Sequence, residues 1–334
     1  MKGGWSTKVL IISVIISVVV IAIIISGTYS SDTIKEILSI DPTLILVALG
    51  LHLVYWFSWA GRIKVLAKSL NYKITYFQSL NIVVLNVLAA SVTPSNAGGE
   101  PVRIKMLNDL GVRGGDATAI VIGERVSDAI FLLSLFPILL IFFSFMLSGL
   151  LGYLLFIAVI LLGSLLLIVF IIVWKHKNFE KLIEKLEPLV KIFIRKPEKR
   201  FKIMEKLKQE FKYFYQGLHI LIMRRKINFV IVILLSAILW ISDFIIFSVV
   251  LLAFHQNPLW AYSILAQIFI VLLTIIPISP GGSGIVELAA AFLYGPFIPK
   301  DIIGVVILIW RFIVFYLNII IGLIFTIRHV VKNY

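Results

Sequence analysis

Two short stretches of the sequence place turn-forming residues and charges beside long apolar runs. "TPSNAGGEPVR" covers residues 93 to 103, and "SPGGSGIVE" covers residues 279 to 287. Glu100 and Arg103 lie three residues apart in the first stretch, and Glu287 closes the second. A turn that opens a helix directs free backbone N–H groups and a partial positive charge at one point, which suits an anion such as phosphate. The two stretches are therefore candidate anion sites.

More charges interrupt apolar sequence elsewhere. The stretch "GERVSD" places Glu124 and Asp128 four residues apart, with Arg125 able to neutralise Asp128. Asp243 and Arg311 lie within other apolar runs. A charge at the centre of a bilayer costs about 2.5 to 3.5 kcal/mol on insertion scales, so a residue kept there usually faces a cavity and a partner. These residues are candidates for a buried polar site.

Arginine is well suited to an anionic headgroup, because its guanidinium group binds phosphate through two N–H groups at once. We expect Arg103, Arg125 and Arg311 to make this contact. The nearby acidic residues can balance the arginines or carry protons, and they are Glu100, Glu124, Asp128 and Glu287.

Purely structural roles stay open for several of these residues. Glu100 can pair with Arg103, and Arg125 with Asp128, only to lock helices together. Arg311 can extend toward the external end of its helix. Helix-packing hydrogen bonds are the alternative role of Asp243, Asn81 and Asn86, whereas interfacial aromatic belts are the expected place of Trp56, Trp59, Trp260 and Tyr262.

The composition sets the class of protein. Of the 334 residues, 60% are hydrophobic and only 14% are charged, and the mean hydropathy is +1.07. These values lie outside the range of soluble globular proteins and predict a polytopic membrane protein. The sequence has no cysteine and only five histidines, which excludes thiolate metal sites and argues against a histidine cluster. We expect no metal, no cofactor and no nucleic-acid partner.

Apolar runs long enough to cross a bilayer give the fold class, an all-α membrane protein with about eight long transmembrane or near-spanning helices. The runs cover residues 9 to 26, 43 to 60, 79 to 93, 117 to 148, 151 to 174, 229 to 254, 259 to 277 and 302 to 327. Two short half-helices, 101 to 110 and 285 to 294, follow the two turns. The first run lacks an A-x-A-like cleavage site, so we interpret it as a helix and not as a secretory signal.

Lysine and arginine in the loops predict the orientation. Residues 175 to 226 hold 16 of the 31 lysines and arginines, which places this segment in the cytoplasm as an amphipathic hairpin or a solvated loop. The loop 61 to 78, with Arg62, is expected on the same side, together with both termini. Loops poor in these residues, 255 to 258 and 295 to 301, are expected outside.

Counting crossings makes residues 79 to 113 a re-entrant hairpin from the cytoplasm and 259 to 294 a re-entrant hairpin from outside. Irregular backbone at membrane depth must be buried in protein or line a wet cavity, so we expect both turns near the midplane. The halves form an inverted-topology pseudo-repeat. The expected domains are a membrane half over 1 to 174, a basic cytoplasmic segment over 175 to 228 and a second membrane half over 229 to 334.

The two motifs, with "GERVSD" between them, resemble the lysylphosphatidylglycerol synthase transmembrane-region family, also called the flippase-like domain family. The resemblance covers nearly the whole chain and implies a lipid translocator in the cell membrane. It also implies a lipid-modifying enzyme or glycosyltransferase as partner. Because the sequence stops at Tyr334, we expect a stand-alone member without a synthase domain. The resemblance points to Gly98, Gly99, Glu100, Arg103, Glu124, Arg125, Asp128, Pro280, Gly281, Gly282, Gly284 and Glu287, to which the turn and charge arguments add Asn96 and Arg311.

The leading hypothesis is a flippase or scramblase that moves an anionic phospholipid or polyprenyl-phosphate-linked lipid between leaflets. No P-loop sequence is present, so a proton gradient or downhill exchange would drive it. An intramembrane lipid-phosphate transferase is one alternative, and it needs metal-binding carboxylates such as the pair Glu124 and Asp128. A small-solute or ion carrier is the other. A carrier predicts a closed polar cavity, whereas a lipid transporter predicts a groove open sideways to the bilayer.

Overall fold

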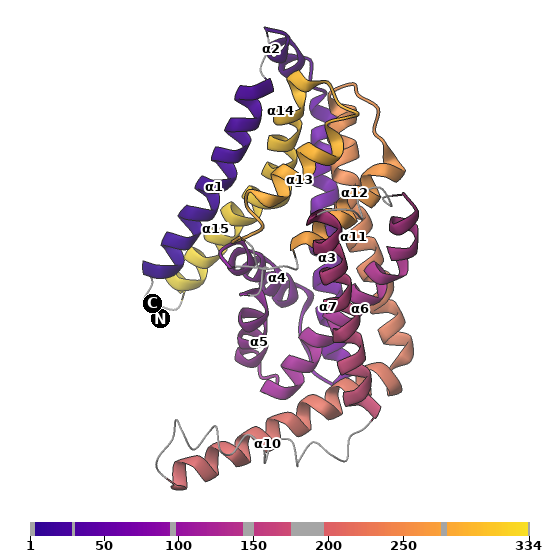
Figure 1. The fold of residues 1–334 in the computed structure, drawn as a ribbon. Helices are drawn as coiled ribbons and strands as arrows, with labels where there is room; N and C mark the ends of the chain where they lie inside the picture. Colours follow the sequence, from indigo (N-terminus) through magenta and orange to yellow (C-terminus); the bar gives the residue numbers. More distant parts are fainter. Residues whose placement is uncertain are drawn as a thin grey trace.

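The computed structural model describes residues 4–28, 31–93, 98–142, 150–174, 197–274 and 279–332. All elements in this part of the chain are helical, as expected for an all-α membrane protein (Figure 1). The elements are α1 (Gly4–Thr28), α2 (Ser31–Leu38), α3 (Pro42–Ser69), α4 (Tyr76–Ser91), α5 (Gly99–Asp109), α6 (Gly114–Phe142), α7 (Leu150–Trp174), α10 (Pro197–His219), the π-helix η3 (Ile220–Arg224), α11 (Lys226–Ala253), α12 (Trp260–Thr274), α13 (Ile285–Tyr294), α14 (Lys300–Arg311), the π-helix η4 (Phe312–Tyr316) and α15 (Leu317–Lys332).

Three helical stretches of the described residues are long and apolar enough to cross a membrane: Pro42–Ser69, Lys226–Ala253 and Lys300–Ile327. The two predicted half-helices are present as α5 and α13, which have 11 and 10 residues. At 1.5 Å per residue neither reaches across about 30 Å of hydrocarbon.

The two halves of the chain repeat one order of elements. α3 and α11 each have 28 residues, and α4 and α12 have 16 and 15. A half-helix and a long helical stretch follow in both halves. α3 and α11 pack together and run antiparallel (Figure 1): Asp41 N donates to Ala253 O at 3.0 Å at one end, and Asn228 donates to Ser69 at 2.9 Å at the other.

Local chemistry sets the ends of the helices in the first half. The Asp41 side chain accepts the Thr43 N–H ahead of α3, with Pro42 in the first turn. Thr75 and Gln78 form a reciprocal capping box at the start of α4. Gly111 has a φ of 86° just after α5, which is the left-handed position that lets glycine end a helix.

Two expectations from the sequence are wrong. The predicted loop 61 to 78 begins too early, because α3 continues to Ser69. Trp56 and Trp59 are 5% and 7% exposed, so they lie inside the helix bundle and not in an interfacial belt. Trp56 donates its indole N–H to Asn318 at 3.0 Å, and this buried hydrogen bond satisfies the polar edge of the ring.

α10 lies across one end of the bundle in Figure 1 and packs against α6. The backbone N–H of Gly115 donates to the Glu210 carboxylate, and Arg113 lies over the Tyr213 ring at 4.0 Å. Part of the basic segment predicted for residues 175 to 226 is therefore a helix docked on the bundle. Residues 175 to 196, the first part of this segment, lie outside the described residues.

Candidate functional site

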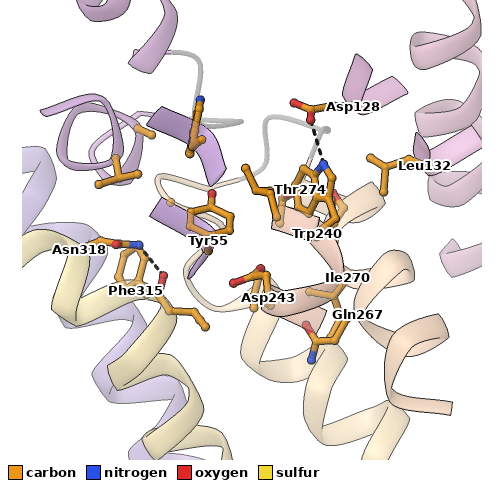
Figure 2. A pocket seen from close by; sticks show the side chains of 18 of the residues that line it. Tyr55, Asp128, Leu132, Trp240, Asp243, Gln267, Ile270, Thr274, Phe315 and Asn318 are labelled. Carbon is orange, nitrogen blue, oxygen red and sulfur yellow. Dashed lines mark hydrogen bonds between the residues drawn. The ribbon is translucent and has the colours of Figure 1, made fainter. Parts of the chain in front are cut away.

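A cavity of about 440 Å³ lies where the two halves of the chain meet (Figure 2). α3, α4, α5, α6 and α7 line it from one half, and α11, α12, α13 and the stretch α14–η4–α15 line it from the other. The charged residues among its lining are Arg62, Glu100, Arg125, Asp128, Asp243 and Arg311. Five of the predicted site residues thus reach one cavity from distant parts of the sequence: Glu100, Arg125, Asp128, Gly281 and Arg311.

The two predicted turns are in direct contact. Gly281 N donates to Thr93 O at 3.3 Å, so the backbone after α4 touches the backbone before α13. Gly281 has a φ of 60° and lines the cavity. A methyl group at Gly281 would lie 2.6 Å from a ring carbon of Phe315 and 2.8 Å from Ser91 O. Residues 94–97, with the predicted Asn96, and residues 275–278 lie outside the described part.

This contact predicts the effect of a small substitution. Gly281→Ala should lower the free energy of unfolding by more than Gly111→Ala. Both glycines have positive φ, where alanine costs about 1 to 2 kcal/mol. Only Gly281 adds a steric clash, because nothing lies within 4 Å of the added methyl at Gly111. Thermal unfolding of the purified proteins compares the two, and equal losses would contradict the tight contact between the turns.

The first half holds a network of arginines and carboxylates. Arg103 donates to Glu124 at 2.7 Å, and both side chains are 1% exposed. Arg125 donates through Nε to Glu100 at 2.8 Å. The two local pairs predicted from spacing are present but longer, since Arg103 lies 3.7 Å from Glu100 and Arg125 lies 3.9 Å from Asp128. The main partners therefore lie on neighbouring helices, α5 and α6.

Arg62 is a site residue that the sequence analysis missed. It is 1% exposed, forms an ion pair with Asp128, and donates to Ser236 of α11 at 2.8 Å. Trp240 also donates to Asp128, at 3.0 Å (Figure 2). The sequence predicts a cytoplasmic loop position for Arg62, because lysine and arginine in loops predict orientation. Its position three residues after Trp59, within helical sequence, is the signal that points to a buried face.

Among the described residues of the second half, Arg311 and Glu287 form a buried ion pair. Arg311 Nε donates to Glu287 at 2.8 Å, and the Glu287 side chain is fully buried. Ser17 of α1 also donates to Glu287 and lies 2.7 Å from the Tyr316 hydroxyl. The sequence gives no sign of the role of Ser17, because the same apolar run also contains Ser13 and Ser26. Arg311 ends α14 where η4 begins, and such π-helical turns frequently occur at functional sites.

The half-helix N-termini hold carboxylates of the chain itself. Glu287 Oε2 accepts the Gly284 N–H at 2.8 Å, which caps α13. Glu100 lies in the first turn of α5 and binds Arg125. The backbone N–H of Gly98 is satisfied by the Thr93 hydroxyl at 2.8 Å. Side chains of the protein therefore already accept several of the backbone N–H groups that were predicted to bind an anion. The groups that remain for an anion in the cavity are the guanidinium groups of its arginines.

The predicted arginines differ in what they face. The Arg125 side chain is 33% exposed and lines the cavity. Arg311 also lines it, and its buried Nη2 has no hydrogen-bond partner among the described residues. Arg103 is 1% exposed and is not part of the lining. The turn residues Gly98, Gly99, Pro280, Gly282 and Gly284, with Glu124 and Glu287, also lie outside the lining and position the groups that form it.

The polar side of the cavity faces an apolar wall. Leu161, Leu162 and Leu165 of α7 line the cavity together with Leu132 of α6. Leu161 is also 44% exposed. The cavity therefore has charged groups and apolar side chains in one lining. A lining of this kind can hold a molecule with a charged end and an apolar end.

Comparison with known proteins gives one family. Residues 10–322 match the family model described as the lysylphosphatidylglycerol synthase TM region. A UPF0104 membrane protein of Archaeoglobus fulgidus is 34% identical over 313 residues, which cover 93% of this chain and 94% of the relative. A UPF0104 membrane protein of Pyrococcus horikoshii is 25% identical over 293 residues, covering 84% of this chain and 85% of the relative.

Proposed function

Because the chain belongs to the lysylphosphatidylglycerol synthase transmembrane-region family, a family of multi-pass membrane proteins, we propose that it moves an anionic lipid between the leaflets of a cell membrane. The observation that carries this proposal is the cavity lined by both charges and leucines. A phosphate-bearing headgroup binds Arg125 and Arg311 at the polar side. The acyl or prenyl chains lie along α7 and remain in contact with the bilayer.

The paired halves support an alternating-access mechanism. α3 and α11 run antiparallel, and the elements after them repeat in the same order. In each half, a glutamate on the half-helix binds an arginine on the helix that follows: Glu100 binds Arg125, and Glu287 binds Arg311. This correspondence supports an inverted repeat with re-entrant hairpins, and we propose that both termini are cytoplasmic because the lysine-rich and arginine-rich segments lie on that side. One half then rocks against the other about the shared site.

The carboxylates of the cavity favour transport over phosphoryl transfer. Asp128 and Glu100 are both engaged by arginine, and a bound guanidinium group competes with a metal ion for the same oxygens. We propose that the protein has no enzymatic step of its own. A partner enzyme supplies or uses the transported lipid.

A leaflet-accessibility assay tests the proposed function. Purified protein is reconstituted into vesicles that contain fluorescent lipids with different headgroups, and a membrane-impermeant reductant reports the fraction in the outer leaflet. Faster loss of protected fluorescence than in protein-free vesicles is expected for anionic headgroups. Folded protein that moves no lipid would contradict the proposal. Chemical conversion of a lipid by the protein in magnesium buffer would favour the transferase, and uptake of a soluble solute would favour the carrier.

A further inference from the structure

Asp243 differs from the other carboxylates around the cavity. Glu100, Glu124, Asp128 and Glu287 each form an ion pair with an arginine. Among the described residues, none forms an ion pair or a hydrogen bond with the Asp243 carboxylate. Asp243 nevertheless lines the cavity and is partly exposed to it (Figure 2). It is thus an acidic side chain that faces the cavity without a cationic partner among the described residues.

Asp243 also lies deep in the helix bundle. It is ten residues before the end of α11 at Ala253, which is about 15 Å at 1.5 Å per residue. Half the hydrocarbon thickness of a bilayer is about the same distance. An ionised carboxylate without a partner at this depth is costly. The side chain must therefore take up a proton or bind a cation that enters the cavity.

The groups around Asp243 do not provide a permanent counter-charge. Trp240, one turn earlier on α11, donates its N–H to Asp128 instead, and Gln267 of α12 is neutral. Tyr55 of α3 lines the same cavity (Figure 2), and its phenol group carries no positive charge. The titratable and charged groups that line the same cavity from neighbouring elements are Tyr55 and Arg62 on α3, Glu100 on α5, Arg125 and Asp128 on α6, and Arg311 on α14. Each of these arginines already has a carboxylate partner.

We infer that Asp243 is a proton-binding site that couples lipid movement to proton movement. A proton from the water that reaches the cavity adds to a carboxylate oxygen of Asp243 and gives the neutral acid. The same proton leaves to water when the cavity opens to the other side. The coupling rests on the proposed lipid transport, whereas protonation of Asp243 in the cavity does not.

Labelling with dicyclohexylcarbodiimide tests the protonation itself. This apolar reagent reacts with protonated carboxyl groups: the proton moves to a carbodiimide nitrogen, a carboxyl oxygen bonds to the central carbon, and the adduct rearranges to an N-acylurea without a leaving group. Mass spectrometry of the full-length protein should locate the label on Asp243, with less label in alkaline buffer. Glu124 and Glu287 are internal controls and should stay unlabelled, because each carboxylate is buried in an ion pair with arginine and neither lines the cavity. Absence of label on Asp243 at every pH overturns the inference.

A pH gradient tests the coupling. The leaflet-accessibility assay is repeated with wild type and Asp243→Asn in vesicles with and without an imposed gradient. The wild-type rate should change several-fold with the gradient, and the rate of the variant should not. Asp109→Asn, which alters an exposed acid on α5, should behave like wild type. A wild-type rate that ignores the gradient overturns the coupling but leaves lipid transport intact, whereas no lipid movement at all contradicts the proposed function itself.

Discussion

Arg103→Ala is expected to lower the free energy of unfolding by about 3 to 5 kcal/mol, the usual result of removing one partner of a buried ion pair. The substitution leaves the Glu124 carboxylate, which is 1% exposed, without its 2.7 Å partner. Thermal unfolding of the purified protein in detergent measures the loss. Lys105→Ala, two residues along the same helix, is the matched control. Its side chain is 75% exposed, so its removal should change stability little.

A double substitution separates charge from packing. Arg103→Met combined with Glu124→Met removes both charges and keeps apolar volume, so it should recover most of the lost stability. Lipid movement should also be retained, because neither residue lines the cavity. A stable double variant that moves no lipid would show instead that Arg103 contacts the headgroup, as the sequence analysis expected. Arg103→Ala with unchanged stability would contradict the buried pair.

Arg125→Ala is expected to reduce the rate of lipid movement at least about tenfold. A hydrogen bond to a charged group contributes about 1.5 to 3 kcal/mol, and about 1.4 kcal/mol corresponds to a factor of ten. The fold should be affected less than by Arg103→Ala, because the side chains of Arg125 and Glu100 are 33% and 26% exposed. The charge left on Glu100 can therefore be hydrated. The initial rate in the leaflet-accessibility assay provides the measurement.

Two further variants test whether the effect of Arg125→Ala comes from the guanidinium group. Arg125→Lys keeps the charge but loses the planar two-nitrogen contact, so its rate should fall between those of wild type and Arg125→Ala. Lys105→Ala should leave the rate unchanged, since Lys105 is remote from the cavity lining. Arg125→Ala with a wild-type rate and normal folding would remove Arg125 from the headgroup site.

The two turns and their half-helices could be predicted because glycine and proline act through local backbone chemistry. Pro101 and Gly111 mark the first turn and the end of α5, and the structure places them there. The contact between Gly281 and Thr93 follows the same expectation that both turns meet. The existence of a shared polar site was thus accessible from the sequence.

The partners within the site could not be predicted with the same success. Spacing of three residues suggested Arg125 with Asp128, but Arg125 binds Glu100 more closely and Asp128 binds Arg62. Residues three apart share a face of a helix, yet spacing does not show which neighbouring helix covers that face. Arg62 was misplaced because loop charge predicts orientation and gives no information on burial.

The ion pair of Glu287 and Arg311 has a consequence for biosynthesis. Its hydroxyl partner, Ser17, lies in the first helix, 270 residues before Glu287. Likewise Arg62 in the first half finds Ser236 only in the second half, 174 residues later. A ribosome delivers the chain from its N-terminus, so these polar groups enter the membrane well before their partners exist. The early helices must therefore remain near the insertion machinery, or keep some water, until the last helices are synthesised.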